Sequence, residues 1–268
     1  MVRGAAAQDA ASPLEGFVAT ELARPAMAEA VAFAKELSTR PGVIAILFYG
    51  SCLQRGTTEG MLDFYALTDG SAGAWQENRA IALAGRALPP NVYPVSHGDL
   101  RAKVAVASLD QFRQRMTLST LDTTFWARFC QRSALLWARD DDVRAMVGEA
   151  VAQGVTTAAI WAERLANGAE GAAAWRALFA KTYRVEIRVE PRSRAGDIVG
   201  VDESRFENLW NLTKQDRATA PRAAPGAWVL RWWMGKVFHL SRLTKAAFTF
   251  EDGPRYLIWK IRRHLGRK

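Results

Sequence analysis

The segment from Val43 to Asp69 constrains the fold of this chain more than any other. It contains an apolar run at residues 43–49, a Gly-Ser pair, a short polar loop and a second apolar run at residues 61–68. Short apolar runs bounded by turn residues are typical of buried β-strands. The segment therefore predicts two strands, Val43 to Tyr49 and Met61 to Thr68, connected by a Gly-Ser turn and a short polar loop.

One acidic residue, Asp63, lies inside the second apolar run. Burial of an unpaired carboxylate is strongly unfavourable, so the position predicts a metal ion or a basic partner. Gly50 allows the backbone to approach a phosphate, and Ser51 with the following amides can donate hydrogen bonds at a helix start. Together they predict a nucleotidyltransferase site, with triphosphate at the turn and magnesium on Asp63. The alternative is an ordinary turn between two strands.

The rest of the chain predicts an α+β protein. A helical region at 14–40, a helix at 75–88 and short strands at 91–95 and 102–107 complete a nucleotidyltransferase-like mixed sheet with flanking helices. Further helices are expected at 109–116, 123–131, 142–167, 172–190 and 203–213, before an Ala- and Pro-rich linker at 218–226. We therefore expect a nucleotidyltransferase domain over 1–138, a helical domain over 139–220 and a basic, aromatic helical tail over 221–268.

The charge of the chain points to an anionic partner. Its 268 residues include 36 Lys and Arg against 27 Asp and Glu, which gives a net charge of +9. Nucleic acid, nucleotide and acidic lipid all fit that charge. The two cysteines match neither a disulfide framework nor a zinc pattern, which fits a reducing compartment. Without a signal peptide or a long apolar segment, we expect a soluble or membrane-surface protein.

A second metal ligand has to come from outside the Asp63 strand. Nucleotidyl transfer sites commonly use two or three carboxylates, and the general pattern places the second one two positions after the first. That position is Tyr65. The predicted replacement is Glu186, which lies one helical turn before Glu190 in a segment where Arg188 is also found. The alternative is a solvated helix with intrahelical Arg–Glu pairs.

Two basic residues in apolar surroundings, Lys103 and Arg128, are expected to face the site. The apolar context would hold their long stems and direct their charges. Arg favours bidentate phosphate contacts and Lys a single point contact. Either residue is otherwise an ordinary surface or strand-end charge.

The tail from Trp228 onward is both cationic and aromatic. It contains ten Lys and Arg residues, two acidic residues and many interleaved aromatic side chains. On a helix, Arg231, Arg242 and Lys245 fall on one side, which predicts an amphipathic helix at an anionic bilayer surface. Docking on the body and stacking on single-stranded nucleic acid are the alternatives, with nucleic acid the least favoured.

Taken in order, five short segments resemble the mitochondrial phosphatidate cytidylyltransferase family, the translocator assembly and maintenance proteins. YGSCLQ is similar to the family's Gly-Ser turn and carries Gly50, Ser51 and Gln54, and MLDF carries Asp63. KVAVAS is similar to a KYGVVS segment and carries Lys103, and WARF is similar to an AGRL segment and carries Arg128. TYRVEIRV is similar to SYTGDFRM, and places Glu186 at the family's aspartate while retaining Tyr183 and Arg188.

The resemblance implies a magnesium-dependent cytidylyltransferase of phospholipid biosynthesis. Such an enzyme transfers CMP from CTP to phosphatidic acid, forms CDP-diacylglycerol, and is a cytoplasmic protein bound peripherally to the inner face of a membrane. The implied metal ligands are Asp63 and Glu186, the implied catalytic lysine is Lys103, and the implied nucleotide-binding residues are Gly50, Ser51, Gln54, Arg128 and Arg188.

The sequence departs from the family pattern at Cys52, which replaces a glycine, and at Gln131-Arg132, which replace Lys-Pro. The alternatives are therefore a nucleotidyltransferase with a soluble small-molecule or protein acceptor, and a catalytically inactive relative that binds nucleotide or nucleic acid.

Overall fold

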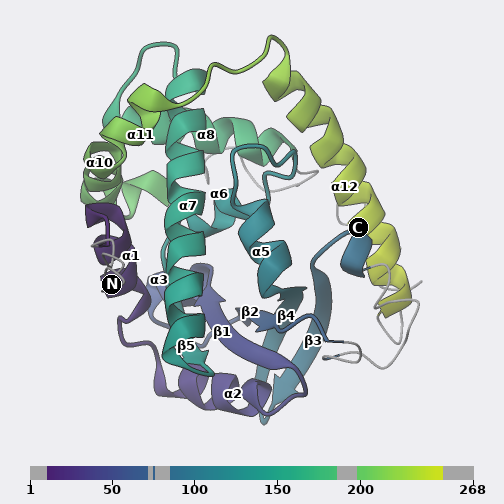
Figure 1. The fold of residues 1–268 in the computed structure, drawn as a ribbon. Coiled ribbons are helices and arrows are strands. Elements are labelled where there is room, and N and C mark those ends of the chain that lie inside the picture. The colour runs from purple at the N-terminus through teal and green to yellow at the C-terminus, as the bar shows by residue number, and fades with distance from the viewer. Residues whose placement is uncertain (1–10, 72–74, 76–84, 186–197, 250–268) are drawn as a thin grey trace, which may run out of the picture.

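The computed structural model describes residues 11–71, 75, 85–185 and 198–249. A five-stranded mixed sheet carries helices on both faces, and a helical region with a long C-terminal helix follows it (Figure 1). The α+β class predicted from the sequence is confirmed. The elements are α1 (Pro13–Leu22), α2 (Ala28–Ser38), β1 (Val43–Tyr49), α3 (Ser51–Arg55), β2 (Met61–Thr68), β3 (Asn91–His97), β4 (Leu100–Ser108), α5 (Leu109–Arg115), α6 (Trp126–Phe129), β5 (Ser133–Ala138), α7 (Asp141–Leu165), α8 (Gly171–Val185), α10 (Glu203–Leu212), α11 (Lys214–Thr219) and α12 (Ala227–Thr249).

The strands lie in the order β3-β4-β2-β1-β5. Strands β2 and β4 are parallel, and the other neighbours are antiparallel. The predicted bounds of β1 and β2 are confirmed residue for residue, while β3 and β4 are longer than expected. The two central strands therefore have the bounds and the order that the Val43 to Asp69 segment predicts.

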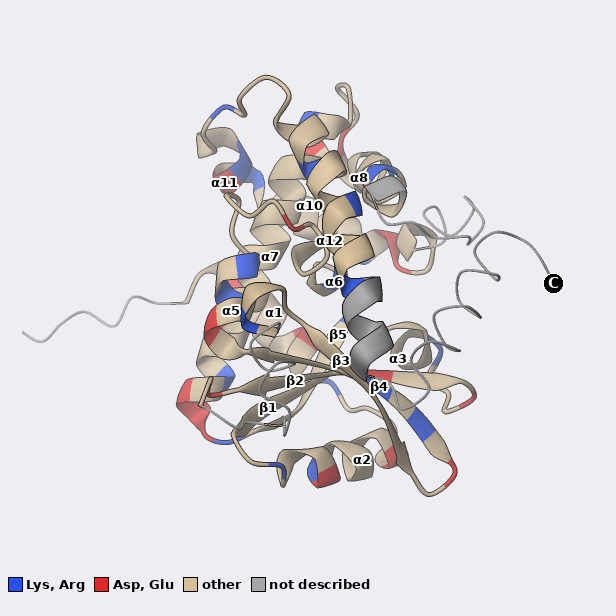
Figure 2. Ribbon diagram, turned by 90° about the vertical axis from the view of Figure 1, so that its right-hand side faces the viewer, with Lys and Arg blue, Asp and Glu red and all other residues tan. Residues whose placement is uncertain are grey.

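Side chains of the central strands alternate between two hydrophobic clusters. Leu62 and Phe64 of β2 pack with Phe33 of α2 on one face of the sheet. Tyr65 and Leu67 belong to the cluster on the opposite face, which the helices of the rest of the chain cover. Figure 2 shows the sheet between α2 and the helical region. Burial on both faces explains why these strands are nearly continuous apolar runs.

Several predicted elements differ from the structure. The expected helical pattern after residue 108 is interrupted by β5, which pairs with β1 at the sheet edge. The helix expected at 123–131 is confined to α6, and the polar loop after Gly50 begins with the short helix α3. The helical region at 14–40 is divided into α1 and α2 around Pro25, because proline lacks the amide that a continuous helix requires. Residues 76–84 of the helix expected at 75–88 lie outside the described residues.

The sheet and the helical region share one hydrophobic core. Tyr65 of β2, Val155 of α7, Trp175 of α8 and Phe206 of α10 belong to the same cluster of buried residues. The sequence segments 1–138 and 139–220 therefore stabilise each other through a common interior.

A buried ion pair also joins distant parts of this core. Arg205 of α10 donates from Nε and Nη2 to the carboxylate of Glu21 in α1, at 2.8 to 2.9 Å, and from Nη1 to the carbonyl oxygen of Cys130 at 3.0 Å. Both side chains are almost fully buried.

Helix α12 docks on the body through the side that carries its arginines. Arg231 is buried, donates to the carbonyl oxygen of Leu118 at 2.8 Å, and lies 4.4 Å from the ring centre of Trp161 in α7. Trp228 packs against the same tryptophan. Arg231 and Arg242 share one side of the helix, as the sequence predicts, and that side faces the protein.

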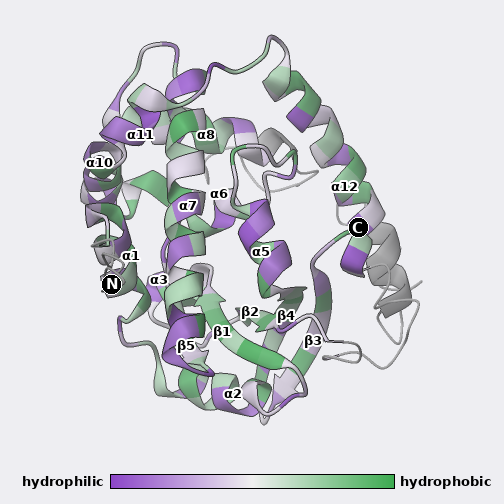
Figure 3. Cartoon of the chain, in the orientation of Figure 1, coloured by the Kyte–Doolittle hydropathy of each residue, from purple (hydrophilic) through white to green (hydrophobic). Residues whose placement is uncertain are grey.

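The opposite side of α12 carries exposed apolar side chains, and Lys236 interrupts their row. We call this surface the outer stripe, and its members, each between 51% and 61% exposed, are Val229, Leu230, Trp233, Val237 and Leu240. Hydrophobic residues recur along α12 at the edge of the molecule (Figure 3). Within the described residues, no helix combines the length and the apolar character needed to cross a bilayer.

Candidate functional site

The turn at Gly50 lies directly against Asp63. Gly50 follows β1 and precedes α3, with φ +87° and ψ −165°. This conformation is almost confined to glycine. A Cβ atom at this position would stand 2.8 Å from Asp63 Oδ2, closer than real Cβ contacts. The turn therefore requires glycine at position 50 for two reasons: its backbone conformation and the close approach of the Asp63 carboxylate.

Asp63 lies in a row of residues that crosses the whole sheet. Tyr49 of β1 is its antiparallel neighbour, and Lys103 of β4 is its parallel neighbour. Ser133 and Pro94 extend the row to the two outer strands. Alternation along β2 places Asp63 on the same face as Tyr65, beneath the helical region.

Burial changes sharply along that face of β2. Tyr65 is completely buried, whereas Asp63 is half-buried near the beginning of the strand. Lys103 is exposed in the neighbouring strand. Because paired residues of adjacent strands lie about 5 Å apart, the lysine and the carboxylate are close neighbours. The row thus places an acidic side chain, Asp63, and a basic side chain, Lys103, near solvent at one edge of the core.

Arg128 lies above the same row. It is half-buried on α6, and its guanidinium carbon lies 5.3 Å from the ring centre of Tyr49. A cation over an aromatic face is held in place without losing its charge. Asp63, Lys103 and Arg128 are therefore brought together from β2, β4 and α6. Ser51 and Gln54 are exposed on α3 directly after the Gly50 turn.

The position expected for a second strand acid is occupied by an aromatic cluster. The ring of Tyr65 packs against those of Tyr49, Phe112, Phe125 and Phe129. Burial raises the pKa of the Tyr65 hydroxyl well above its ordinary value. Its oxygen has no hydrogen-bond partner among the described residues. Strand β2 consequently offers one carboxylate.

One carboxylate beside a glycine turn fits a magnesium ion that shares its ligands with a nucleotide. Magnesium sites commonly consist of one or two carboxylates, substrate phosphates and waters. Among the described residues, no group of three His, Cys, Asp or Glu side chains forms a site that could hold a metal without such a substrate. The other predicted ligand, Glu186, and the predicted nucleotide-binding residue Arg188 lie outside the described residues.

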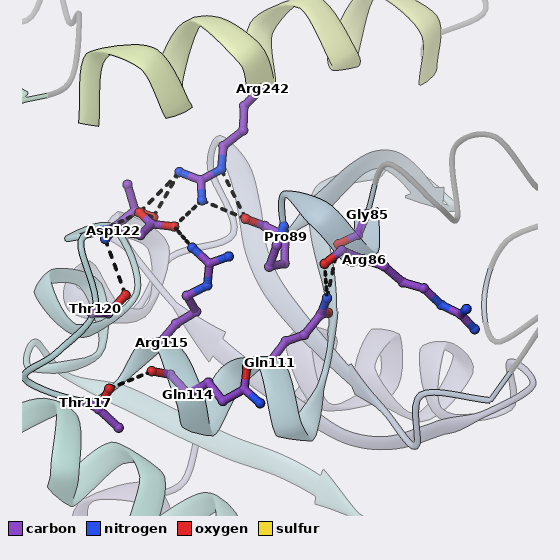
Figure 4. A network of polar contacts seen from close by, with 11 residues as sticks. Gly85, Arg86, Pro89, Gln111, Gln114, Arg115, Thr117, Thr120, Asp122 and Arg242 are labelled. Atoms are coloured by element: carbon purple, nitrogen blue, oxygen red, sulfur yellow. Dashed lines mark hydrogen bonds and ion pairs between the residues drawn. The ribbon is translucent and has the colours of Figure 1, made fainter. Parts of the chain in front are cut away.

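Two further residues near the site were not predicted from the sequence. The ring of Tyr49 supports Arg128, and Tyr49 pairs with Asp63 across the two strands. Its position directly before Gly50 is the sequence feature that could have indicated this role. Asp122 is almost fully buried between Arg115 and Arg242 (Figure 4). Burial raises its pKa, but the charge and hydrogen bonds of Arg242 and hydrogen bonds from Thr124 outweigh that effect and hold the pKa below its ordinary value. An Asp-Thr-Thr sequence is a recognisable turn signal.

Comparison with known proteins gives a distant structural similarity. No protein-family model matches the chain, and no curated protein matches its sequence. Among solved structures, a nucleotidyltransferase-like protein from Exiguobacterium sibiricum aligns over 87% of this chain and 78% of its own length, with 9% identity and a TM-score of 0.29.

Proposed function

We propose that the protein is a magnesium-dependent nucleotidyltransferase that transfers CMP from CTP to phosphatidic acid at a membrane surface. The observation that carries the proposal is the approach of Asp63 Oδ2 to the Gly50 turn, in register with Lys103. A glycine turn, a carboxylate and a basic side chain are the groups needed to bind a metal-bound triphosphate.

Each residue of the site has a distinct proposed role. The Gly50 turn and the Ser51 hydroxyl bind triphosphate oxygens, and Gln54 contributes a further hydrogen bond. Asp63 and Glu186 hold magnesium, which neutralises phosphate charge when it is bound. Lys103 provides a point charge, and Arg128 and Arg188 provide planar donors for phosphate oxygens.

The transfer itself requires little proton chemistry. An oxygen of the acceptor's phosphate forms a bond to the α-phosphorus of CTP, the bond from that phosphorus to the bridging oxygen breaks, and pyrophosphate leaves in line. Because the acceptor oxygen is already anionic, no strong general base is needed, and rate comes from position and charge. Lys103 and Arg128 can stabilise the charge that develops on the transferred and leaving groups.

The outer stripe of α12 supports a membrane-bound acceptor. An exposed apolar row on a helix that is already docked can lie in the headgroup region of a bilayer. The net charge of +9 favours an anionic membrane, which fits a cytoplasmic protein bound peripherally to the inner face of a membrane. Nucleic acid is a less favoured partner, because Arg231 and Arg242 are engaged in hydrogen bonds to Leu118 and Pro89 of the protein itself.

The test is a transfer assay with purified protein, magnesium, labelled CTP and liposomes that contain phosphatidic acid. The proposal predicts labelled CDP-lipid and pyrophosphate in equal amounts, and loss of both in Asp63→Asn. Transfer to a soluble phosphate-bearing acceptor, with no lipid product, would support the nucleotidyltransferase activity and reject phosphatidic acid as the acceptor. Absence of transfer with CTP, ATP and GTP, over a set of lipid and soluble acceptors, would reject the enzyme.

The burial of Tyr65 favours a second candidate, a relative that binds nucleotide without turnover. Removal of the second strand acid is a simple way to lose metal-dependent catalysis while keeping the fold. Thermal stabilisation by magnesium and CTP in the absence of any transfer would support this candidate.

A further inference from the structure

Helix α12 holds the segment between α5 and α6 at two points. Arg231 donates to the carbonyl oxygen of Leu118 at 2.8 Å. Eleven residues later, Arg242 forms an ion pair with Asp122 and donates from Nη1 to Thr124 Oγ1 at 3.2 Å. The same guanidinium donates to the carbonyl oxygen of Pro89, just before β3, at 2.6 and 3.1 Å (Figure 4).

The carboxylate of Asp122 orients the beginning of α6. Its Oδ1 accepts hydrogen bonds from the amide of Thr124 at 3.1 Å and from the Thr124 hydroxyl at 2.6 Å. The carbonyl oxygen of Thr123 accepts the amide of Ala127 at 3.1 Å, which closes the first helical turn. The turn that starts α6 is therefore built on a side chain that Arg242 holds.

Arg128 lies in that same short helix, six residues after Asp122. The charges of Arg128, Arg242 and Asp122 all influence the pKa of the buried Tyr65 hydroxyl, so Arg128 and the Asp122–Arg242 pair surround the same side chain. A small rotation of α6 about its aromatic anchors would move the Arg128 guanidinium away from Tyr49 and from the row that contains Asp63.

We propose that Arg242 is a positioning residue, which fixes the start of α6 through Asp122 and thereby places Arg128 beside the triphosphate. The inference rests on the proposed function, because it assigns a nucleotide to the site. It makes the docking of α12 a condition for tight nucleotide binding.

The structure offers variants that separate positioning from folding. In Arg242→Gln, Arg115 still pairs with Asp122, at 3.2 Å, so the carboxylate keeps a cation and the protein is expected to fold. Arg242→Lys keeps the charge and loses the planar fork, so an intermediate effect is expected. Lys236→Gln is a matched control, since Lys236 lies on the same helix with its ammonium group 4.4 Å from the ring centre of Trp232.

The first measurement is amide hydrogen exchange, which needs no nucleotide. Arg242→Gln is expected to speed exchange of the amides in 118–129 by about tenfold, while the central strands β1 and β2 exchange as in the wild type. Lys236→Gln is expected to leave both regions unchanged. Unchanged exchange of 118–129 in Arg242→Gln would overturn the inference.

The second measurement is the affinity for CTP with magnesium, in a double-mutant cycle. Arg242→Gln is expected to raise Kd about tenfold in the wild-type background, and to have no further effect in Arg128→Gln. Additive effects, or an unchanged Kd in Arg242→Gln, would overturn the inference alone. Wild-type protein that binds no nucleotide would contradict the proposed function and the inference with it, whatever the exchange rates.

Discussion

The carboxylate of Asp63 lies so close to the backbone of Gly50 that a methyl group on Gly50 would stand 2.8 Å from Asp63 Oδ2. This contact joins the end of β1 to the beginning of β2 at the place where the sequence predicts a phosphate-binding turn. Because the two residues are in such close contact, a substitution at either one is expected to displace the other.

Gly50→Ala should therefore damage the site as well as the backbone. A side chain at φ +87° is strained by about 1–3 kcal/mol, and its Cβ displaces the carboxylate. We expect a lower melting temperature and loss of magnesium-dependent CTP binding. Gly56→Ala is the matched control, because Gly56 also has positive φ but a Cβ there meets no atom within 4 Å. Equal loss of binding in the two variants would contradict this account.

Lys103→Gln should weaken nucleotide chemistry and leave stability unchanged. The side chain is exposed, so its removal is expected to change the free energy of unfolding by less than about 0.5 kcal/mol. Loss of one phosphate contact is expected to reduce kcat/KM for CTP by about 100-fold. Lys35→Gln, an exposed lysine on α2 at the other face of the sheet, should leave kcat/KM unchanged. Steady-state kinetics and thermal unfolding check both statements.

Arg205→Met should be the most destabilising of the ion-pair substitutions. It leaves Glu21 charged and buried without its bidentate partner, at a cost of about 3–5 kcal/mol. We expect a fall in Tm of roughly 10 °C by calorimetry. Arg176→Met removes an exposed pair with Glu203 and should cost less than about 1 kcal/mol. Similar shifts in the two variants would show that the Glu21 pair is not a core interaction.

The cluster around Asp122 should make stability depend on acid pH. Its pKa in the folded protein lies below the ordinary value of about 3.9, so the unfolded chain binds a proton first as the pH falls. The stabilisation is thus complete above about pH 4 and is lost as the pH falls through the folded pKa. Asp122→Asn should lower Tm at pH 6 and flatten its decline below about pH 4. Parallel Tm curves for the two proteins would rule this out.

Polar substitutions in the outer stripe should release the protein from anionic vesicles. Trp233→Ser with Leu240→Ser removes two apolar side chains that are 59% and 61% exposed, so Tm should change little. Flotation with vesicles of phosphatidylcholine and phosphatidic acid should fall at least tenfold. Val31→Ser, an exposed apolar residue of α2, should float like the wild type. A wild-type protein that stays in solution would refute the membrane proposal.

The parts of the fold that the sequence predicted best are those where local pattern and burial agree. The apolar runs of β1 and β2 are buried on both faces, and their turn residues mark the bounds. Strand β5 was missed because Ser133–Ala138 is a short apolar run, which pattern alone does not separate from a buried helical turn. Only pairing with β1, more than 80 residues earlier, decides between them.

The residues of the candidate site likewise fall into those that a local motif predicts and those that depend on long-range contacts. Gly50, Asp63 and Lys103 were predicted from short motifs, and strand register brings them together. The roles of Tyr49 and Asp122 depend on contacts between residues that are distant in sequence, such as the pair of Asp122 with Arg242, 120 residues later. No local pattern specifies such a partner. The outward direction of the apolar side of α12 follows likewise from where its arginines dock.

The most direct test of the central claim is calorimetric titration of CTP into the wild type and Asp63→Asn, each with magnesium and with EDTA. The account predicts 1:1 binding to the wild type that weakens at least tenfold in EDTA, and binding to Asp63→Asn that is weak and insensitive to magnesium. Equal, magnesium-dependent affinity in the two proteins would contradict the assignment of the metal to Asp63, and absence of binding to the wild type would contradict a nucleotide site at the Gly50 turn.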